Sequence, residues 1–124
     1  MASAGNWFET ERKAFDLRTK ELLSSVATYT ARVGGASDNF IVDRVIRVDG
    51  TSGTALVITL PNGKYYGQQI LVTLDIWAAT STVDVDVETT AGTDSTQITG
   101  AGGYTMLVWL GGTTGWVEFA NAVT

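Results

Sequence analysis

Short stretches of alternating apolar and polar residues follow one another from Phe40 to the end of the chain. In residues 68–77 the apolar side chains occupy every second position, and in residues 82–88 valine alternates with acidic residues. A period of two is typical of a β-strand with one buried face. Turns that contain glycine or proline separate these stretches. Strands are therefore predicted at residues 40–48, 54–60, 68–77, 82–88, 97–99 (short), 104–110 and 116–119.

The spacing of these strands predicts the fold class. Six or seven strands within about 85 residues, with turn signals every ten residues or so, are typical of an antiparallel β-sandwich or barrel. A strand–helix alternation that would favour a parallel α/β sheet is absent from the sequence. We therefore expect a mainly β protein with antiparallel neighbours.

The first part of the chain has a different pattern. Asn6 followed by Glu9 forms a capping box, and no glycine or proline interrupts the chain from Trp7 to about Ser25. Phe8, Phe15 and Leu22 recur every seven residues, which gives a narrow apolar stripe on a charged helix. This helix would pack either on its own domain or on another subunit. The break at residues 34–38 then divides the chain into an N-terminal helical arm, residues 1–33, and a β domain, residues 34–124.

Composition excludes several functions. The 124 residues include no His and no Cys, so His-based triads, thiolate nucleophiles and the common zinc sites are not possible. The net charge of −5 argues against a nucleic-acid partner, which would require clustered cations. We recognise no signal peptide and no membrane-spanning segment.

Three carboxylates lie on one predicted strand, at Asp84, Asp86 and Glu88. Their neighbours would be roughly 6.5–7 Å apart along a strand face. A hard-cation site and a paired-carboxylate glycosidase both fit such spacing, but a solvated face that discourages aggregation is the favoured interpretation. The glycine-rich stretches at residues 100–103 and 111–115 lack the features of a nucleotide loop and are interpreted as turns. No cofactor and no metal is predicted.

Aromatic residues lie at strand ends or near turns. Exposed rings there would stack on sugars or anchor a protein interface, whereas buried rings would belong to the core. Trp77 is out of phase with its strand and is the ring most expected to be exposed. The strand around Trp109 is apolar on both faces, so it is either central in the fold or buried between subunits. These rings are Tyr65, Tyr66, Trp77, Tyr104, Trp109 and Trp116.

Residues 54–119 resemble a pattern common in structural proteins of tailed bacteriophages. In that pattern an apolar strand ends in Leu-Pro, a glycine precedes a strand of the type G-x-x-I-x-V, and a late strand leads into W-x-G-x-x-x-x-W. Leu110 stands where an Asp or Tyr is often found in that pattern. The matching positions are Leu60-Pro61, Gly67, Ile70, Val72, Trp109, Gly111 and Trp116.

The resemblance implies a non-enzymatic virion protein with a jelly-roll-like or β-barrel unit, commonly trimeric. A small chain with a helical arm and one β domain is most similar to a capsid decoration (cement) or head-fibre protein. Its partners would be further copies of itself in a homotrimer and the major capsid protein. It would be made in the host cytoplasm and would stabilise the capsid surface by multivalent binding.

The interface with the capsid or between subunits is predicted on the front helix and the late strands. Two alternatives stay open: a receptor- or carbohydrate-binding module of a fibre or tail, and an enzyme that uses the acidic residues. A neck or tail-tube component belongs to the same broad class as the main prediction. The predicted interface residues are Trp7, Phe8, Arg12, Phe15, Arg18, Leu22, Met106, Val108, Trp109 and Trp116.

Overall fold

The computed structural model of the chain describes residues 19–23, 26–35, 39–76, 81–88 and 94–122. Within these residues the protein is built almost wholly of β-strands, with one helix of four residues. The elements are β1 (Thr19–Leu23), β2 (Thr28–Thr30), β3 (Val33–Gly35), β4 (Asn39–Val42), β5 (Val45–Asp49), β6 (Ala55–Leu60), β7 (Gln69–Ile76), β8 (Thr82–Val87), β9 (Gly103–Trp109), α2 (Gly111–Thr114) and β10 (Trp116–Ala122).

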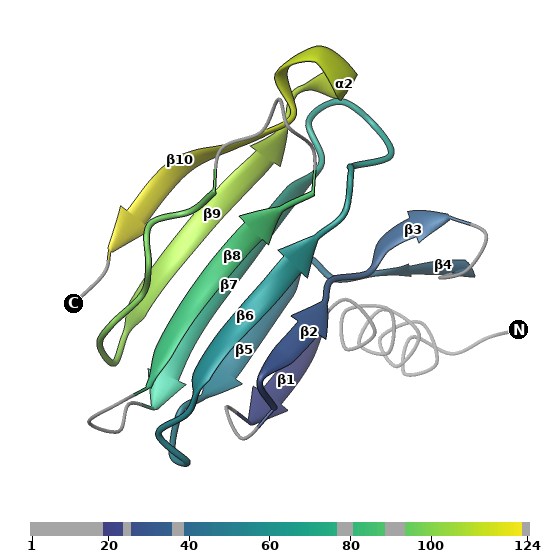
Figure 1. Ribbon diagram of the computed structural model, residues 1–124. Helices are drawn as coiled ribbons and strands as arrows, with labels where there is room; N and C mark the ends of the chain where they lie inside the picture. The colour runs from purple at the N-terminus through teal and green to yellow at the C-terminus, as the bar shows by residue number, and fades with distance from the viewer. Residues whose placement is uncertain (1–18, 24–25, 36–38, 77–80, 89–93, 123–124) are drawn as a thin grey trace, which may run out of the picture.

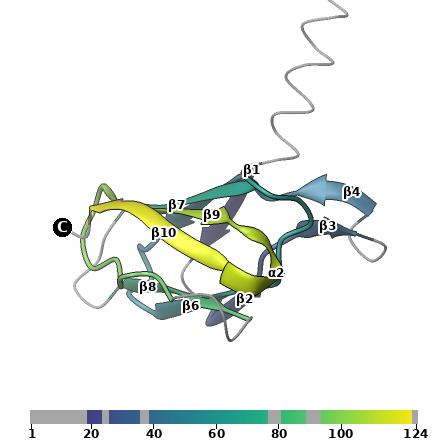
Figure 2. The same cartoon turned by 90° about the horizontal axis from the view of Figure 1, so that it is seen from above.

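The described strands form three sheets. A five-stranded sheet, called sheet A, has the order β1-β5-β7-β9-β10, and a three-stranded sheet B has the order β2-β6-β8. Strands β3 and β4 pair by themselves as sheet C. Sheets A and B lie as two layers, with sheet C beside them (Figures 1 and 2).

The chain alternates between the two large sheets as it winds. It runs from β1 in sheet A to β2 in sheet B, makes the excursion through sheet C, and then passes through β5, β6, β7 and β8 in alternate sheets. Each return to sheet A places a new strand beside the previous one in parallel. Each return to sheet B does the same.

The winding has a nearly constant period. Thr19 pairs with Val45 and Val45 pairs with Leu71, so 26 residues separate partners at both steps of sheet A. In sheet B the corresponding separations are 29 residues, from Thr28 to Val57, and 27 residues, from Ala55 to Thr82. The strand pairing therefore recurs at a nearly constant interval, although the sequence has no recognisable repeat. Strands β9 and β10, which are antiparallel, end the winding.

The expectation of antiparallel neighbours is wrong for most of the fold. Four of the seven strand pairs in the described residues are parallel. Parallel strands require a long crossover connection, which is usually a helix. Here the crossover is a strand of the opposite sheet, so parallel pairing arises in a sequence that has no strand–helix alternation.

The predicted helix is also wrong at its C-terminal end. Residues Thr19–Leu23 form β1, which pairs with β5 along its whole length. The side chain of Leu22 lies in the core, 8% exposed. Pairing with a strand far along the chain overrides a local helical pattern here. The rest of that prediction lies outside the described residues.

The core lies between sheets A and B and follows the predicted alternation. Along β9 buried and half-buried residues alternate without interruption, and in β7 every second residue is buried. Sheet B contributes its own alternate residues from β6 and β8. The largest fully buried side chains include Trp116, Ile46, Leu56, Ile58, Leu60, Ile70, Leu74, Ile98 and Leu107.

Candidate interaction surfaces

The outer face of sheet A carries a row of apolar side chains that crosses four strands. Val45 of β5 pairs with Leu71 of β7, Leu71 pairs with Met106 of β9, and Met106 pairs with Ala120 of β10. All four are half-buried. Directly opposed residues share one face of a sheet, so these four side chains form one continuous apolar row.

A second row extends this surface toward the end of the sheet that carries α2. Val108 of β9 lies between Gln69 of β7 and Val117 of β10. Both valines are half-buried. Sheet B lies on the opposite side of sheet A, and no described strand or helix covers this face (Figure 2). We call the six residues Val45, Leu71, Met106, Val108, Val117 and Ala120 the outer apolar face.

A charged margin borders this face on β1, β5 and β7, at the end of the sheet away from α2. The Arg47 guanidinium donates to Asp75 at 2.7 Å and to Glu21 at 3.2 Å. These side chains are partly or largely exposed, and hydrogen bonding to Asp75 raises the pKa of Arg47 further. Water screens such pairs, so this margin adds little to stability but gives the face a polar rim.

The predicted interface residues of the late strands are divided between two faces. Met106 and Val108 belong to the outer apolar face. Trp109 and Trp116 point into the core, where they are 6% and 1% exposed and their ring centroids are 5.6 Å apart. The Trp116 indole N–H donates to the Pro61 carbonyl at 2.8 Å. The two indoles therefore pack the interior of the single chain, and only Met106 and Val108 offer surface to a partner.

The remaining predicted interface residues lie at the front of the chain. Leu22 is a core residue of β1 and does not face a partner. Trp77, the ring expected to be exposed, lies outside the described residues. So do the predicted helical interface residues Trp7, Phe8, Arg12, Phe15 and Arg18.

Of the three carboxylates on the acidic strand, Asp86 and Glu88 are exposed and Asp84 is half-buried. Asp86 is exposed, and its pKa is raised by desolvation and then by the nearby charges of Asp94 and Asp84. Asp84 accepts a hydrogen bond from the Gln97 amide at 2.9 Å, and Asp94 accepts one from the Val87 amide at 2.9 Å. The described residues contain no group of three or more acidic side chains that could hold a metal ion.

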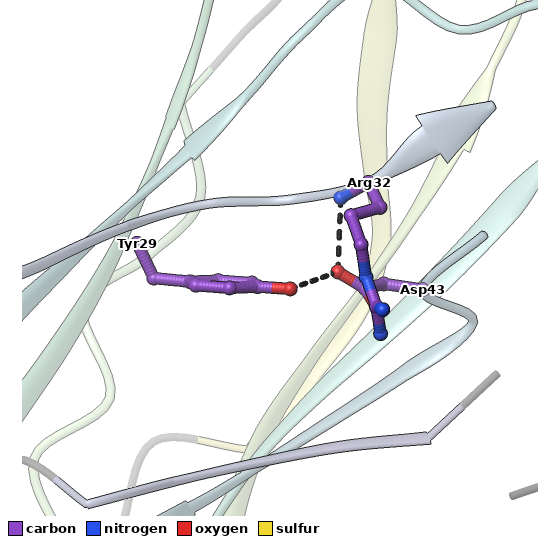
Figure 3. Close-up of polar contacts among 3 residues, drawn as sticks. All are labelled: Tyr29, Arg32 and Asp43. Carbon is purple, nitrogen blue, oxygen red and sulfur yellow. Dashed lines mark hydrogen bonds and ion pairs between the residues drawn. The ribbon is translucent and has the colours of Figure 1, made fainter. Parts of the chain in front are cut away.

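A buried ionic cluster joins β2 to the turn before β5. The Asp43 carboxylate accepts hydrogen bonds from the Tyr29 hydroxyl, the Arg32 amide and the Arg32 guanidinium, at 2.5 to 2.9 Å (Figure 3). Burial and then the bond to Asp43 raise the pKa of Tyr29. The hydrogen bond that Arg32 donates to Asp43 likewise raises the pKa of Arg32.

The cluster ties the segment after β2 to the segment before β5. Every buried polar side-chain atom in the described residues has a hydrogen-bond partner. The sequence signal for it is Asp43, an acid inside the apolar run 40–48. Sequence reasoning treated that run as one strand, whereas Asp43 and Arg44 separate β4 from β5.

Comparison with known proteins does not assign the chain to a family. No protein-family model matches it, and no curated protein sequence matches it significantly. Among the described residues no helix is long and apolar enough to cross a membrane.

Proposed function

We propose that this protein is a non-enzymatic structural protein of a bacteriophage virion, which decorates the capsid as a trimer. The observation that carries the proposal is the outer apolar face. Soluble monomers rarely leave a continuous apolar surface uncovered, and such surfaces usually mark a site of association. A polar margin around an apolar centre, as Arg47 and Asp75 provide here, is the usual anatomy of an interface.

The absence of His and Cys from the whole sequence supports a role in binding rather than in catalysis. The described residues also leave no buried polar side-chain atom without a partner. The resemblance to phage structural proteins at Leu60-Pro61 and around Trp109 supports a place in a virion. The jelly-roll-like unit that the resemblance implies is not needed for this function, because the outer apolar face of sheet A also offers apolar side chains to a partner.

Self-association is tested by the solution mass of the purified chain. Light scattering should give three times the 13.2 kDa of one chain. Val108→Lys would place a charge in the outer apolar face and should release monomers. Val57→Lys is the matched control, because Val57 is an equally half-buried valine on the outer face of sheet B. A monomeric wild-type chain would contradict the trimer. Dissociation by the control variant alone would show that the outer apolar face is not the surface that holds it.

The location is tested by immunogold labelling of phage particles from cells that carry the gene. Label on the heads supports capsid decoration. Label confined to tails or fibres supports the fibre or tail module instead. Intact particles that carry no label would overturn the virion proposal.

A further inference from the structure

Two loops meet at one end of the molecule and present two exposed tyrosines. Residues 61–68 connect β6 to β7, and residues 110–115 contain α2; both lie at the same end (Figure 1). A Cβ placed on Gly111 would be 4.0 Å from the ring of Tyr66, so the two loops are neighbours. Tyr65 is 59% exposed and Tyr66 is 76% exposed. We call this end the tyrosine tip.

Backbone bonds hold the first loop to strand β9. The Gly67 amide donates to the Trp109 carbonyl at 2.8 Å, and the Trp109 amide donates to the Gln68 carbonyl at 2.8 Å. Gly63 lies directly on the indole of Trp109, since a Cβ at Gly63 would be 2.3 Å from the nearest ring carbon. The loop is therefore packed against the buried indole of Trp109 and hydrogen-bonded to its backbone.

The buried amide of Gln68 braces the loop from inside. Its oxygen accepts from the Lys64 amide at 2.7 Å, and its nitrogen donates to the Val33 carbonyl at 3.1 Å. The Gln68 backbone amide closes the turn by donating to the Tyr65 carbonyl at 3.1 Å. A loop held in this way presents its tyrosines in one arrangement, which lowers the entropy lost on binding.

The surroundings of the tyrosines indicate the kind of partner. Apart from the two rings, the exposed residues of these loops are glycine, threonine, asparagine and lysine, with no exposed aliphatic side chain. The fully buried centre of a protein interface is usually more apolar than its rim, and the two loops expose no aliphatic side chain for such a centre. A nucleic acid would need clustered cations, whereas Lys64 is the only charged residue of the two loops in a chain of net charge −5.

We propose that the tyrosine tip is a saccharide-binding site. The aromatic faces of Tyr65 and Tyr66 would stack on the C–H faces of sugar rings, while their hydroxyls stay at the polar edge. The side chains of Asn62, Lys64, Thr113 and Thr114 supply hydrogen-bond donors and acceptors for sugar hydroxyls. No carboxylate lies in either loop, so the site accepts neutral sugars and, through Lys64, acidic ones.

The test uses the full chain and four probes: cellohexaose, chitohexaose, maltoheptaose and hexagalacturonate. Saturation-transfer NMR should detect binding of at least one probe, and titration calorimetry then measures its affinity. Tyr65→Ala and Tyr66→Ala should each weaken that binding by about tenfold or more, since one stacked ring is lost. Tyr66→Phe should keep most of the affinity because it keeps the ring.

Phe119→Ala is the matched control, because Phe119 is an exposed ring, 48% accessible, on β10 and away from the tip. It should bind the probe as the wild type does. Binding of none of the four probes at 10 mM, or equal loss in Phe119→Ala, would overturn the proposal. Met106 belongs to the outer apolar face and lies two residues farther from the tip along β9 than Val108. Met106→Lys should therefore retain saccharide binding even where it dissociates the trimer. The experiments can therefore overturn the trimer and the saccharide site independently of each other.

Discussion

The guanidinium of Arg32 donates to the carboxylate of Asp43, with Nε 2.8 Å from Oδ1, and the Asp43 side chain is completely buried. Arg32 follows β2 of sheet B, and Asp43 precedes β5 of sheet A. The pair thus closes the excursion through β3 and β4 at the point where the chain leaves one sheet and returns to the other. The Asp43 amide also donates to the Arg32 carbonyl at 2.7 Å, which fixes the same junction through the backbone.

Asp43→Asn should destabilise the protein strongly. The substitution leaves the partly buried Arg32 without its counter-ion, and breaking a buried pair costs about 3 kcal/mol or more. Chemical denaturation measures the loss as a lower midpoint. Asp75→Asn is the control, because it removes the exposed partner of Arg47 and should change the midpoint far less. Equal effects of the two substitutions would contradict a special role for Asp43.

Tyr29→Phe should lower stability by roughly 1.5 kcal/mol, the typical contribution of a hydrogen bond to a charged group. The contribution of Tyr29 to stability should also depend on pH in the alkaline range. Since burial raises the pKa of Tyr29 in the folded state, the unfolded chain loses this proton first, near pH 10. The contribution of Tyr29 is therefore complete below that pH and declines as pH rises toward the folded pKa. Denaturation between pH 8 and 11 should show the wild-type curve approaching that of the variant, and parallel curves would refute this linkage.

Gly63→Ala should destabilise the fold by about 2 kcal/mol, as overpacking of a well-filled site usually does. The added methyl would meet the Trp109 ring at 2.3 Å, and the ring is held in the core. Gly112→Ala is the matched control, because nothing lies within 4 Å of a Cβ there. Thermal melts of the two variants should separate clearly. A Gly63→Ala protein as stable as Gly112→Ala would show that the loop does not sit on Trp109.

Asp86→Asn should raise the melting temperature slightly at pH 7, on the order of 1 °C for a screened surface charge. Desolvation and the charges of Asp94 and Asp84 raise the pKa of Asp86, so its ionised form opposes folding at neutral pH. The wild type recovers this stability as the pH falls through the folded pKa of Asp86, and the gain of the variant should vanish below about pH 4. Melts at pH 3.5 and pH 7 measure this difference.

Asp49→Asn should lower the stability at pH 7, whereas Asp86→Asn should raise it. Hydrogen bonds from Thr51 lower the pKa of Asp49, so its ionised form supports folding at neutral pH and this support is lost as the pH falls through that lowered pKa. The variant should be less stable than the wild type at pH 7, with the difference shrinking in acid. A stabilising Asp49→Asn would contradict the assigned bonds.

The alternation of residues predicted β6, β7, β8, β9 and β10, because it depends only on which side chains are buried. It did not predict β1 or β2, it merged β4 and β5, and the short strand expected at residues 97–99 is an isolated bridge at Ile98. Val83 and Val85 point inward and Asp86 outward, as the period of two requires. The direction of pairing could not be predicted, because a strand with one buried face has the same pattern beside a parallel or an antiparallel neighbour. In Thr19–Leu23 the seven-residue apolar spacing that ends at Leu22 was misleading, and pairing with β5 decided the outcome.

The candidate surface was predicted only in part, for a related reason. Met106, Val108 and Trp109 belong to one apolar strand, and the sequence does not say which face meets solvent. Leu107 pairs with Ile70, and both side chains face the core. Met106 and Val108, the neighbours of Leu107 along β9, therefore face outward. The buried pair of Arg32 with Asp43 joins the segment after β2 to the segment before β5, 11 residues apart along the chain, which no local pattern encodes.

Because partners in sheet A are 26 residues apart at both steps, one circuit through the two sheets acts as a structural repeat of about this length. Each circuit adds one strand to each sheet and leaves a new edge of the same kind, so a further circuit could be inserted without disturbing the existing ones. The antiparallel strands β9 and β10 break this rule and stop growth on one side. At the other side β1 is the edge strand among the described residues, so within this part of the chain the parallel pairing rule is broken at one edge of sheet A only.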